Sequence, residues 1–103
     1  MKIQYLPAAV ADLQNTCLYI AEKLNNPTAA YRLKERILQS ISLLKDNPLM
    51  GRPFSTRFDD WNGTDYRYFI VAKQLIFYRV SEDAIHIIRI LDSRTDYLAE
   101  LFS

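Results

Sequence analysis

The sequence predicts an α+β fold in which an antiparallel sheet packs against a helical hairpin. Residues 2–6 alternate between polar and apolar side chains, as a half-buried strand does. Two amphipathic helical patterns follow in the first half of the chain, and three strand-like runs fill most of the second half. The expected element order is β-α-α-β-β-β-α, arranged in two layers.

The two helical patterns are separated by a short break. Apolar residues recur at spacings of three and four from Val10 to Leu24 and again from Leu33 to Leu44. Pro7 suits the first turn of the first helix, and Asn26 is a candidate N-cap for the second. Helices joined by so few residues pack as antiparallel neighbours, which predicts an α-hairpin.

Residues 66–71, 75–80 and 85–91 are rich in aromatic and β-branched side chains and are separated by a few turn residues. Before them, residues 47–64 read as a long connection containing prolines and glycines. After them, Asp92 or Ser93 can cap a final helix with an apolar stripe at Tyr97, Leu98, Leu101 and Phe102.

Composition indicates one ordinary globular domain spanning residues 1–103, with half of its residues hydrophobic. The net charge is +1, with six basic against four acidic residues in 1–51 and seven against eight in 52–103. This balance excludes a broad basic surface for nucleic acid, so any such contact would be local. Cys17 is alone, and no signal peptide or membrane-spanning run is visible, so we expect a cytoplasmic protein.

Each strand-like run carries one arginine, Arg67, Arg79 and Arg89, which a sheet does not need for its burial. A two-residue turn at Lys73-Gln74 would put Arg67 and Arg79 on opposite faces, whereas a three-residue turn at 72–74 would set them directly across from each other. Neither turn has the Asn-Gly or Asp-Gly sequence that would decide between them. A four-residue loop at 81–84 pairs Arg79 with His86, and the same register points Arg89 to the other face.

With the longer turn, Arg67, Arg79 and His86 would form one polar row that could bind a phosphate or a partner's carboxylates. Arg52, in the long connection, is a further candidate for such contacts. The alternative is that these residues are solvated surface charges. The sequence has no glycine-rich phosphate loop, no metal-ligand spacing and no nucleophile elbow, so we expect no cofactor and no metal.

Four segments together resemble the RelE/ParE family of bacterial toxins. They are Asn47–Pro53, Tyr66-Arg67, the phrase LIFYRV at 75–80, and ILDSRTDY at 90–97, after an opening strand and helical hairpin. The resemblance covers essentially the whole chain and implies the same element order. It also implies the toxin of a type II toxin–antitoxin pair, a plasmid-stabilization type of system, which inhibits growth when free and is neutralised by a small antitoxin.

The family has two activities. RelE-like members cleave mRNA on the ribosome, and ParE-like members poison DNA gyrase. By resemblance, a nuclease would use Arg67 and Arg94 as phosphate clamps, with Tyr97 or His86 in proton transfer. However, Leu75 and Glu100 stand where RelE-like nucleases place an arginine and a tyrosine. These departures favour gyrase as the target, with ribosome-dependent cleavage as the alternative.

Overall fold

The computed structural model describes residues 1–53 and 65–94. Its elements are β1 (Lys2–Tyr5), α1 (Pro7–Leu18), the π-helical η1 (Tyr19–Lys23), α2 (Pro27–Ser42), the 3-10 helix η2 (Leu43–Lys45), β2 (Arg52–Pro53), β3 (Asp65–Val71), β4 (Gln74–Val80) and β5 (Ala84–Asp92). The predicted strand, helical hairpin and three later strands are confirmed. The predicted final helix lies outside the described residues.

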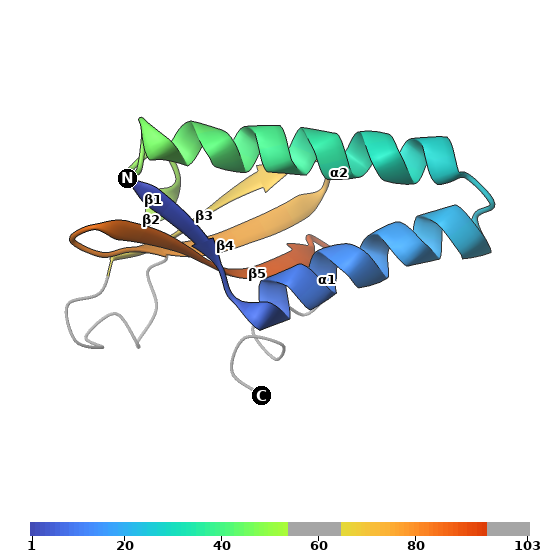
Figure 1. Ribbon diagram of the computed structural model, residues 1–103, viewed down its shortest axis with the longest axis horizontal. Coiled ribbons are helices and arrows are strands. Elements are labelled where there is room, and N and C mark those ends of the chain that lie inside the picture. The colour runs from blue at the N-terminus through green and yellow to red at the C-terminus, as the bar shows by residue number, and fades with distance from the viewer. Residues whose placement is uncertain (54–64, 95–103) are drawn as a thin grey trace.

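The strands form one mixed sheet in the order β1-β5-β4-β3-β2 (Figure 1). The three long strands pair antiparallel, as expected, whereas β1 joins the edge of β5 in parallel. The short strand β2 lies within the segment predicted as a connection and pairs with β3. The α-hairpin and strands β2 to β4 separate β1 from β5 in sequence, so no tight turn forces these two strands to be antiparallel.

Both helices pack on one face of the sheet, which we call the helix face. Figure 1 shows α2 along this face and α1 beside β5. The main core joins apolar side chains of both helices to alternate residues of β4 and β5: Ala9, Leu13, Ile37, Ile41, Leu44, Ile76, Tyr78, Ile85, Ile87 and Ile90. A two-layer sandwich is therefore observed, as the periodicities predict.

The helix ends follow from local chemistry. The Asn26 side chain accepts a hydrogen bond from the Ala29 backbone N–H at 3.1 Å, which confirms it as the N-cap of α2. Pro7 and Pro27 occupy the first turns of their helices. Between the helices, Asn25 has φ 50°, a left-handed conformation that asparagine tolerates better than most residues.

The β3–β4 turn contains two residues, Ala72 and Lys73, because Val71 pairs with Gln74. Both turn residues have positive φ, at 51° and 65°, as the mirror-image hairpin turns require. The turn has the length of the shorter predicted turn but begins one residue earlier, and it is one residue shorter than the longer predicted turn. Its consequence is that of the shorter alternative: Arg67 and Arg79 lie on opposite faces, so the predicted row of Arg67, Arg79 and His86 does not form.

Between β4 and β5 the register shifts by one residue. Arg79 pairs with His86, as predicted, but Phe77 pairs with Arg89, leaving Ile88 as an extra residue in β5. This β-bulge turns Arg89 onto the face that carries Arg79 and His86, so the prediction that Arg89 points the other way is wrong.

A buried tyrosine fixes the loop that precedes β2. The Tyr78 hydroxyl accepts a hydrogen bond from the Gly51 N–H at 2.9 Å and donates one to the Pro48 carbonyl, also at 2.9 Å. Tyr78 is fully buried, so its hydroxyl depends on these loop groups for hydrogen bonds. These hydrogen bonds therefore anchor the loop to the folded core.

Replacing Gly51 by alanine is expected to destabilise the protein by about 2 kcal/mol, because overpacking and a lost buried hydrogen bond act together. The added Cβ would lie 2.5 Å from the Tyr78 hydroxyl oxygen and 2.9 Å from the Tyr68 carbonyl oxygen. Denaturant unfolding measures the change. Met50→Ala, at the exposed neighbouring position, is the matched control, and an equal loss in both variants would contradict this account.

Candidate functional site

The face of the sheet opposite the helices carries most of the predicted binding residues. We call it the arginine face and define it by Arg52, Arg79, His86 and Arg89, which the strand register places on one side. Arg52 pairs with Tyr68, and Tyr68 pairs with Phe77. Because Phe77 in turn pairs with Arg89, these side chains share one face from β2 to β5. No described helix packs across this face, although its Arg89 forms an ion pair with Asp12 of α1.

One polar row crosses four strands of the arginine face. Gln4, His86, Arg79 and Tyr66 are direct neighbours in β1, β5, β4 and β3. Arg79 and His86 are half-buried, and within the described residues the His86 Nδ1 has neither a hydrogen-bond partner nor contact with solvent. A guanidinium beside an imidazole can bind a phosphate or a carboxylate through their N–H donors.

A small apolar cluster lies next to this row. Leu75, Phe77 and Leu91 are buried, and Tyr68 and Ile88 pack against them. The Tyr68 and Phe77 ring centroids are 6.0 Å apart, within the range of favourable aromatic pairs. The arginine face therefore combines aromatic and guanidinium groups, the side chains most enriched at protein interfaces.

Arg67 is not part of this face. Its guanidinium Nη1 donates to the Gly51 carbonyl at 2.8 Å and to the Leu49 carbonyl at 3.2 Å, on the same side of β3 as the core residue Phe69. These bonds, with those of Tyr78, hold the loop before β2 in place. The structure thus gives Arg67 a structural contact where the sequence suggested a phosphate clamp.

Arg94 is engaged as well. Its Nε and Nη2 atoms bond the two carboxylate oxygens of Asp92 at 2.9 and 2.7 Å, although three-quarters of the Arg94 side chain is exposed. Asp92 pairs with Gln74 at the far end of β4 from Arg79. Asp92 lies six positions after His86 in β5, about 20 Å at ~3.3 Å per residue, so one phosphate cannot bridge the two. Tyr97, the third predicted catalytic residue, lies outside the described residues.

The pKa of Asp92 is lowered to about 2, chiefly by the side-chain hydrogen bond from Arg94 and then by the Arg94 backbone N–H. Because the carboxylate is favoured in the folded state, this pair contributes stability above pH 4 that is lost as the pH falls towards 2. The contribution is small, since Arg94 is largely exposed and screened by solvent. We expect an NMR titration to give a low pKa for Asp92, and Arg94→Gln to raise it towards 3.8.

If Asp92 titrates alike in the wild type and in Arg94→Gln, the pair does not form in solution. Arg32→Gln is the matched control, because Arg32 is an exposed arginine of α2 without an ion pair in the described structure. This control is expected to leave the Asp92 titration unchanged.

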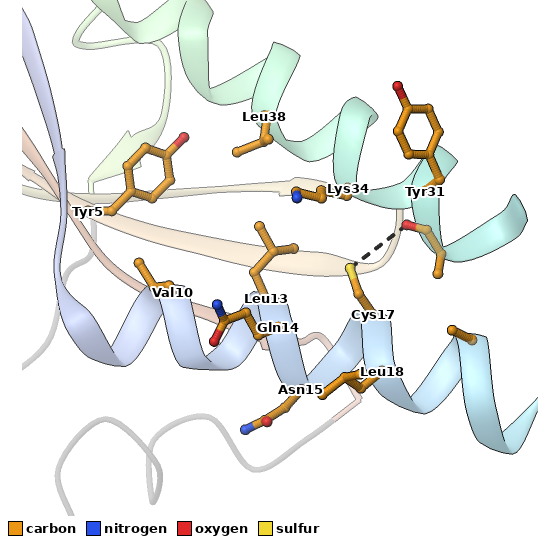
Figure 2. A pocket seen from close by; sticks show the side chains of 12 residues that line it. Tyr5, Val10, Leu13, Gln14, Asn15, Cys17, Leu18, Tyr31, Lys34 and Leu38 are labelled. Carbon is orange, nitrogen blue, oxygen red and sulfur yellow. Dashed lines mark hydrogen bonds between the residues drawn. The ribbon is translucent and has the colours of Figure 1, made fainter. Parts of the chain in front are cut away.

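A second surface, which the sequence did not predict, lies between the helices. It is a groove of about 670 Å³ lined mainly by apolar residues of α1, η1 and α2, with Tyr5 of β1 at one end (Figure 2). Leu13 and Cys17 point from α1 towards α2, and the Cys17 thiol contacts the Ala30 carbonyl at 3.8 Å. Burial raises the pKa of this thiol, which fits a packing role rather than a reactive one.

The rim of this hairpin groove leaves large apolar side chains in solvent. Leu18 is 54% exposed, Tyr31 65% and Val10 39%. Exposed apolar side chains gathered along a groove mark an interaction surface, whereas scattered ones do not. The helical periodicity alone could not reveal this groove, because it does not show which apolar positions the second helix leaves uncovered.

The described part of the chain contains neither a metal-binding cluster nor a membrane-spanning helix. Within residues 1–53 and 65–94, no group of three or more His, Cys, Asp or Glu side chains could hold a metal ion. The helices in these same ranges are also too short or too polar to cross a membrane.

Comparison with known proteins places this geometry in a family context. Residues 3–97 match the family model described as the ParE toxin of the type II toxin–antitoxin system parDE. No curated protein matches the sequence. Among solved structures, a chain of the chromosomal ParDE toxin–antitoxin system from P. aeruginosa is 21% identical, with a TM-score of 0.67 over 89% of this chain and 95% of that one.

A chain of the E. coli DinJ–YafQ complex is 16% identical, with a TM-score of 0.55 over 99% of this chain and 98% of the other. At these identities the two structures establish the shared fold alone.

Proposed function

Because the chain belongs to the ParE toxin family of type II toxin–antitoxin systems, we propose that it inhibits growth when free by acting on DNA gyrase, and that a small cognate antitoxin neutralises it. The observation that carries the choice of target is the placement of Arg67. A residue whose guanidinium is bonded to the Leu49 and Gly51 carbonyls on the helix face cannot also clamp a phosphate on the arginine face.

The remaining residues of the expected nuclease set are also dispersed. RNA cleavage by a 2′-hydroxyl needs proton-transfer groups and cations around a single phosphate. Arg94 is bonded to Asp92, about 20 Å along β5 from His86. This dispersal favours a toxin that works by binding a protein over one that cleaves RNA.

We assign the two surfaces to two partners. The hairpin groove, with its exposed Leu18 and Tyr31, suits an amphipathic helix of the antitoxin, since such helices bury one apolar face in a groove of this kind. The arginine face, with Arg52, Arg79 and His86, suits an acidic surface of the target. Binding of the two partners can then be tested separately.

An mRNA endoribonuclease is the alternative function, favoured by one feature: the half-buried Arg79–His86 pair with its unpartnered Nδ1. In that case His86 would serve in proton transfer, and the phosphate would bind at Arg79 rather than at Arg67 or Arg94.

The deciding experiment induces the protein, maps mRNA 5′ ends and assays supercoiling by purified gyrase. Loss of supercoiling without new mRNA ends is expected. Arg79→Gln should weaken gyrase inhibition by about tenfold or more, because a desolvated interface arginine is a frequent hot spot. Arg32→Gln, an exposed arginine on α2, is the matched control. New codon-positioned ends with normal gyrase activity would refute the gyrase proposal.

A further inference from the structure

We propose that residues 47–52, which we call the anchored loop, bind the gyrase target by inserting Leu49 and Met50 into an apolar pocket bordered by carboxylates. This inference rests on the proposed gyrase function and adds the contact residues and the chemistry of the complementary site. Its basis is the hydrogen-bonded backbone of the loop, the exposure of its apolar side chains and the charge next to them.

The tip of the anchored loop is a β-turn. The Met50 N–H donates a hydrogen bond to the Asn47 carbonyl at 3.1 Å. Pro48 is the second residue of this turn, where its fixed φ suits the common turn types, and Leu49 is the third. The Asn47 Nδ2 also donates to the Leu43 carbonyl at 3.2 Å, which ties the start of the turn to η2. The Leu49 side chain is thus carried on a short, closed turn.

Two residues of the sheet hold the same loop from within the protein. The Arg67 Nη1 donates to the Leu49 and Gly51 carbonyls at 3.2 and 2.8 Å. The Tyr78 hydroxyl donates to the Pro48 carbonyl and accepts from the Gly51 N–H, both at 2.9 Å. Because Tyr78 is fully buried, movement of the loop would leave its hydroxyl unpaired. A loop that is ordered in this way before it binds loses little conformational entropy on binding.

The ordered backbone keeps two large apolar side chains in solvent. Leu49 is 58% exposed and Met50 43%. At these exposures they contribute little to the protein's own core, whereas burial against a partner would remove their apolar area from water. Methionine and arginine are also enriched at protein interfaces. A fixed loop that presents adjacent apolar side chains is therefore suited to fill a pocket on another protein.

The charge beside the tip indicates the chemistry of that pocket. Arg52 is exposed and has no ion pair with a described residue, and residues 47–53 contain no aspartate or glutamate. Arg52 also belongs to the arginine face, so the anchored loop continues the surface assigned to the target. A pocket that is apolar at its base and acidic at its rim complements both the tip and this cation.

The first test measures the toxin concentration that halves supercoiling by purified gyrase. Leu49→Asp should raise this concentration at least about tenfold, because it places a charge at an apolar contact of the interface. Leu24→Asp is the matched control, since Leu24 is 57% exposed and follows η1, and it should inhibit like the wild type. Both positions are exposed, so thermal unfolding should show that both variants remain folded.

The second test loosens the loop without changing its exposed side chains. Tyr78→Phe removes the hydroxyl that holds Pro48 and Gly51 and should raise the half-inhibiting concentration about threefold. This loss should disappear in the Leu49→Asp background, because both changes act through one contact. Ile37→Val, in the core beneath α2, is the control and should lower the melting temperature without changing inhibition.

Three results would overturn the inference while leaving the proposed function intact. One is equal inhibition by Leu49→Asp and Leu24→Asp. Another is a Tyr78→Phe loss that matches Ile37→Val or persists unchanged in the Leu49→Asp background. The third is self-association of the free toxin that Leu49→Asp abolishes, because the loop would then bind a second copy. A wild-type protein that does not inhibit gyrase would instead refute the proposed function, and this inference with it.

Discussion

Replacing Leu18 by aspartate is expected to weaken antitoxin binding at least about 30-fold and to leave cells arrested even when the antitoxin is co-expressed. Leu18 lines the hairpin groove and is 54% exposed, so the substitution puts a charge into the proposed interface without opening the core. Central apolar positions of interfaces commonly contribute about 2 kcal/mol or more. Calorimetric titration of toxin with antitoxin measures the loss, and growth assays show its consequence.

The control for this variant is Leu43→Asp. Leu43 is 56% exposed and belongs to η2, and it does not line the groove. It makes the same chemical change at almost the same exposure, so any general effect on solubility or folding appears in both variants. Equal antitoxin affinity in the two variants would show that the groove is not the binding site.

Replacing Asp12 by alanine is expected to cause the largest loss of stability among single substitutions in the described ion pairs, about 2–3 kcal/mol. Asp12 bonds the Arg89 guanidinium at 2.7 and 2.9 Å and also accepts the Ile90 backbone N–H at 3.0 Å. The two side chains are only 13% and 21% exposed, so removing the carboxylate leaves poorly solvated donors behind. For a domain of this size the midpoint of thermal unfolding should fall by roughly 10–20 °C.

Two further variants isolate the cause. Asp12→Asn keeps an acceptor for the Ile90 N–H while it removes the charge, so its loss should be smaller than that of alanine. Asp46→Ala changes an exposed aspartate that follows η2 and should have little effect. Equal melting temperatures for Asp12→Ala, Asp12→Asn and Asp46→Ala would show that Asp12 does not hold the edge of β5.

Local patterns in the sequence predicted most of the fold. The Asn26 cap, the prolines at the helix starts and the period-two runs depend on neighbouring residues only, and each has the predicted structure. The Arg79–His86 pairing was also predictable, because a four-residue loop fixes its register. The parallel position of β1 was not, since nothing local states which sheet edge a strand will join.

The arginine face was predicted only in part, because two single-residue features decide it. The turn at Ala72 and Lys73 has no glycine or asparagine to mark its left-handed residues, and it sends Arg67 to the helix face. The bulge at Ile88 is not marked by a glycine or proline in the sequence, and it brings Arg89 to the arginine face. The sequence did not predict the ion pair between Asp12 and Arg89 either, because the two residues are 77 positions apart.

The hydrogen bonds of Arg67 also bear on how related sequences are classified. If the basic side chain after Tyr66 is retained to hold the backbone before β2, its presence in an aligned homologue is a marker of folding and not of ribonuclease activity. Homologues that cleave RNA and homologues that do not would then share this arginine equally. Activity within the family should instead follow the side chains on the opposite side of the sheet.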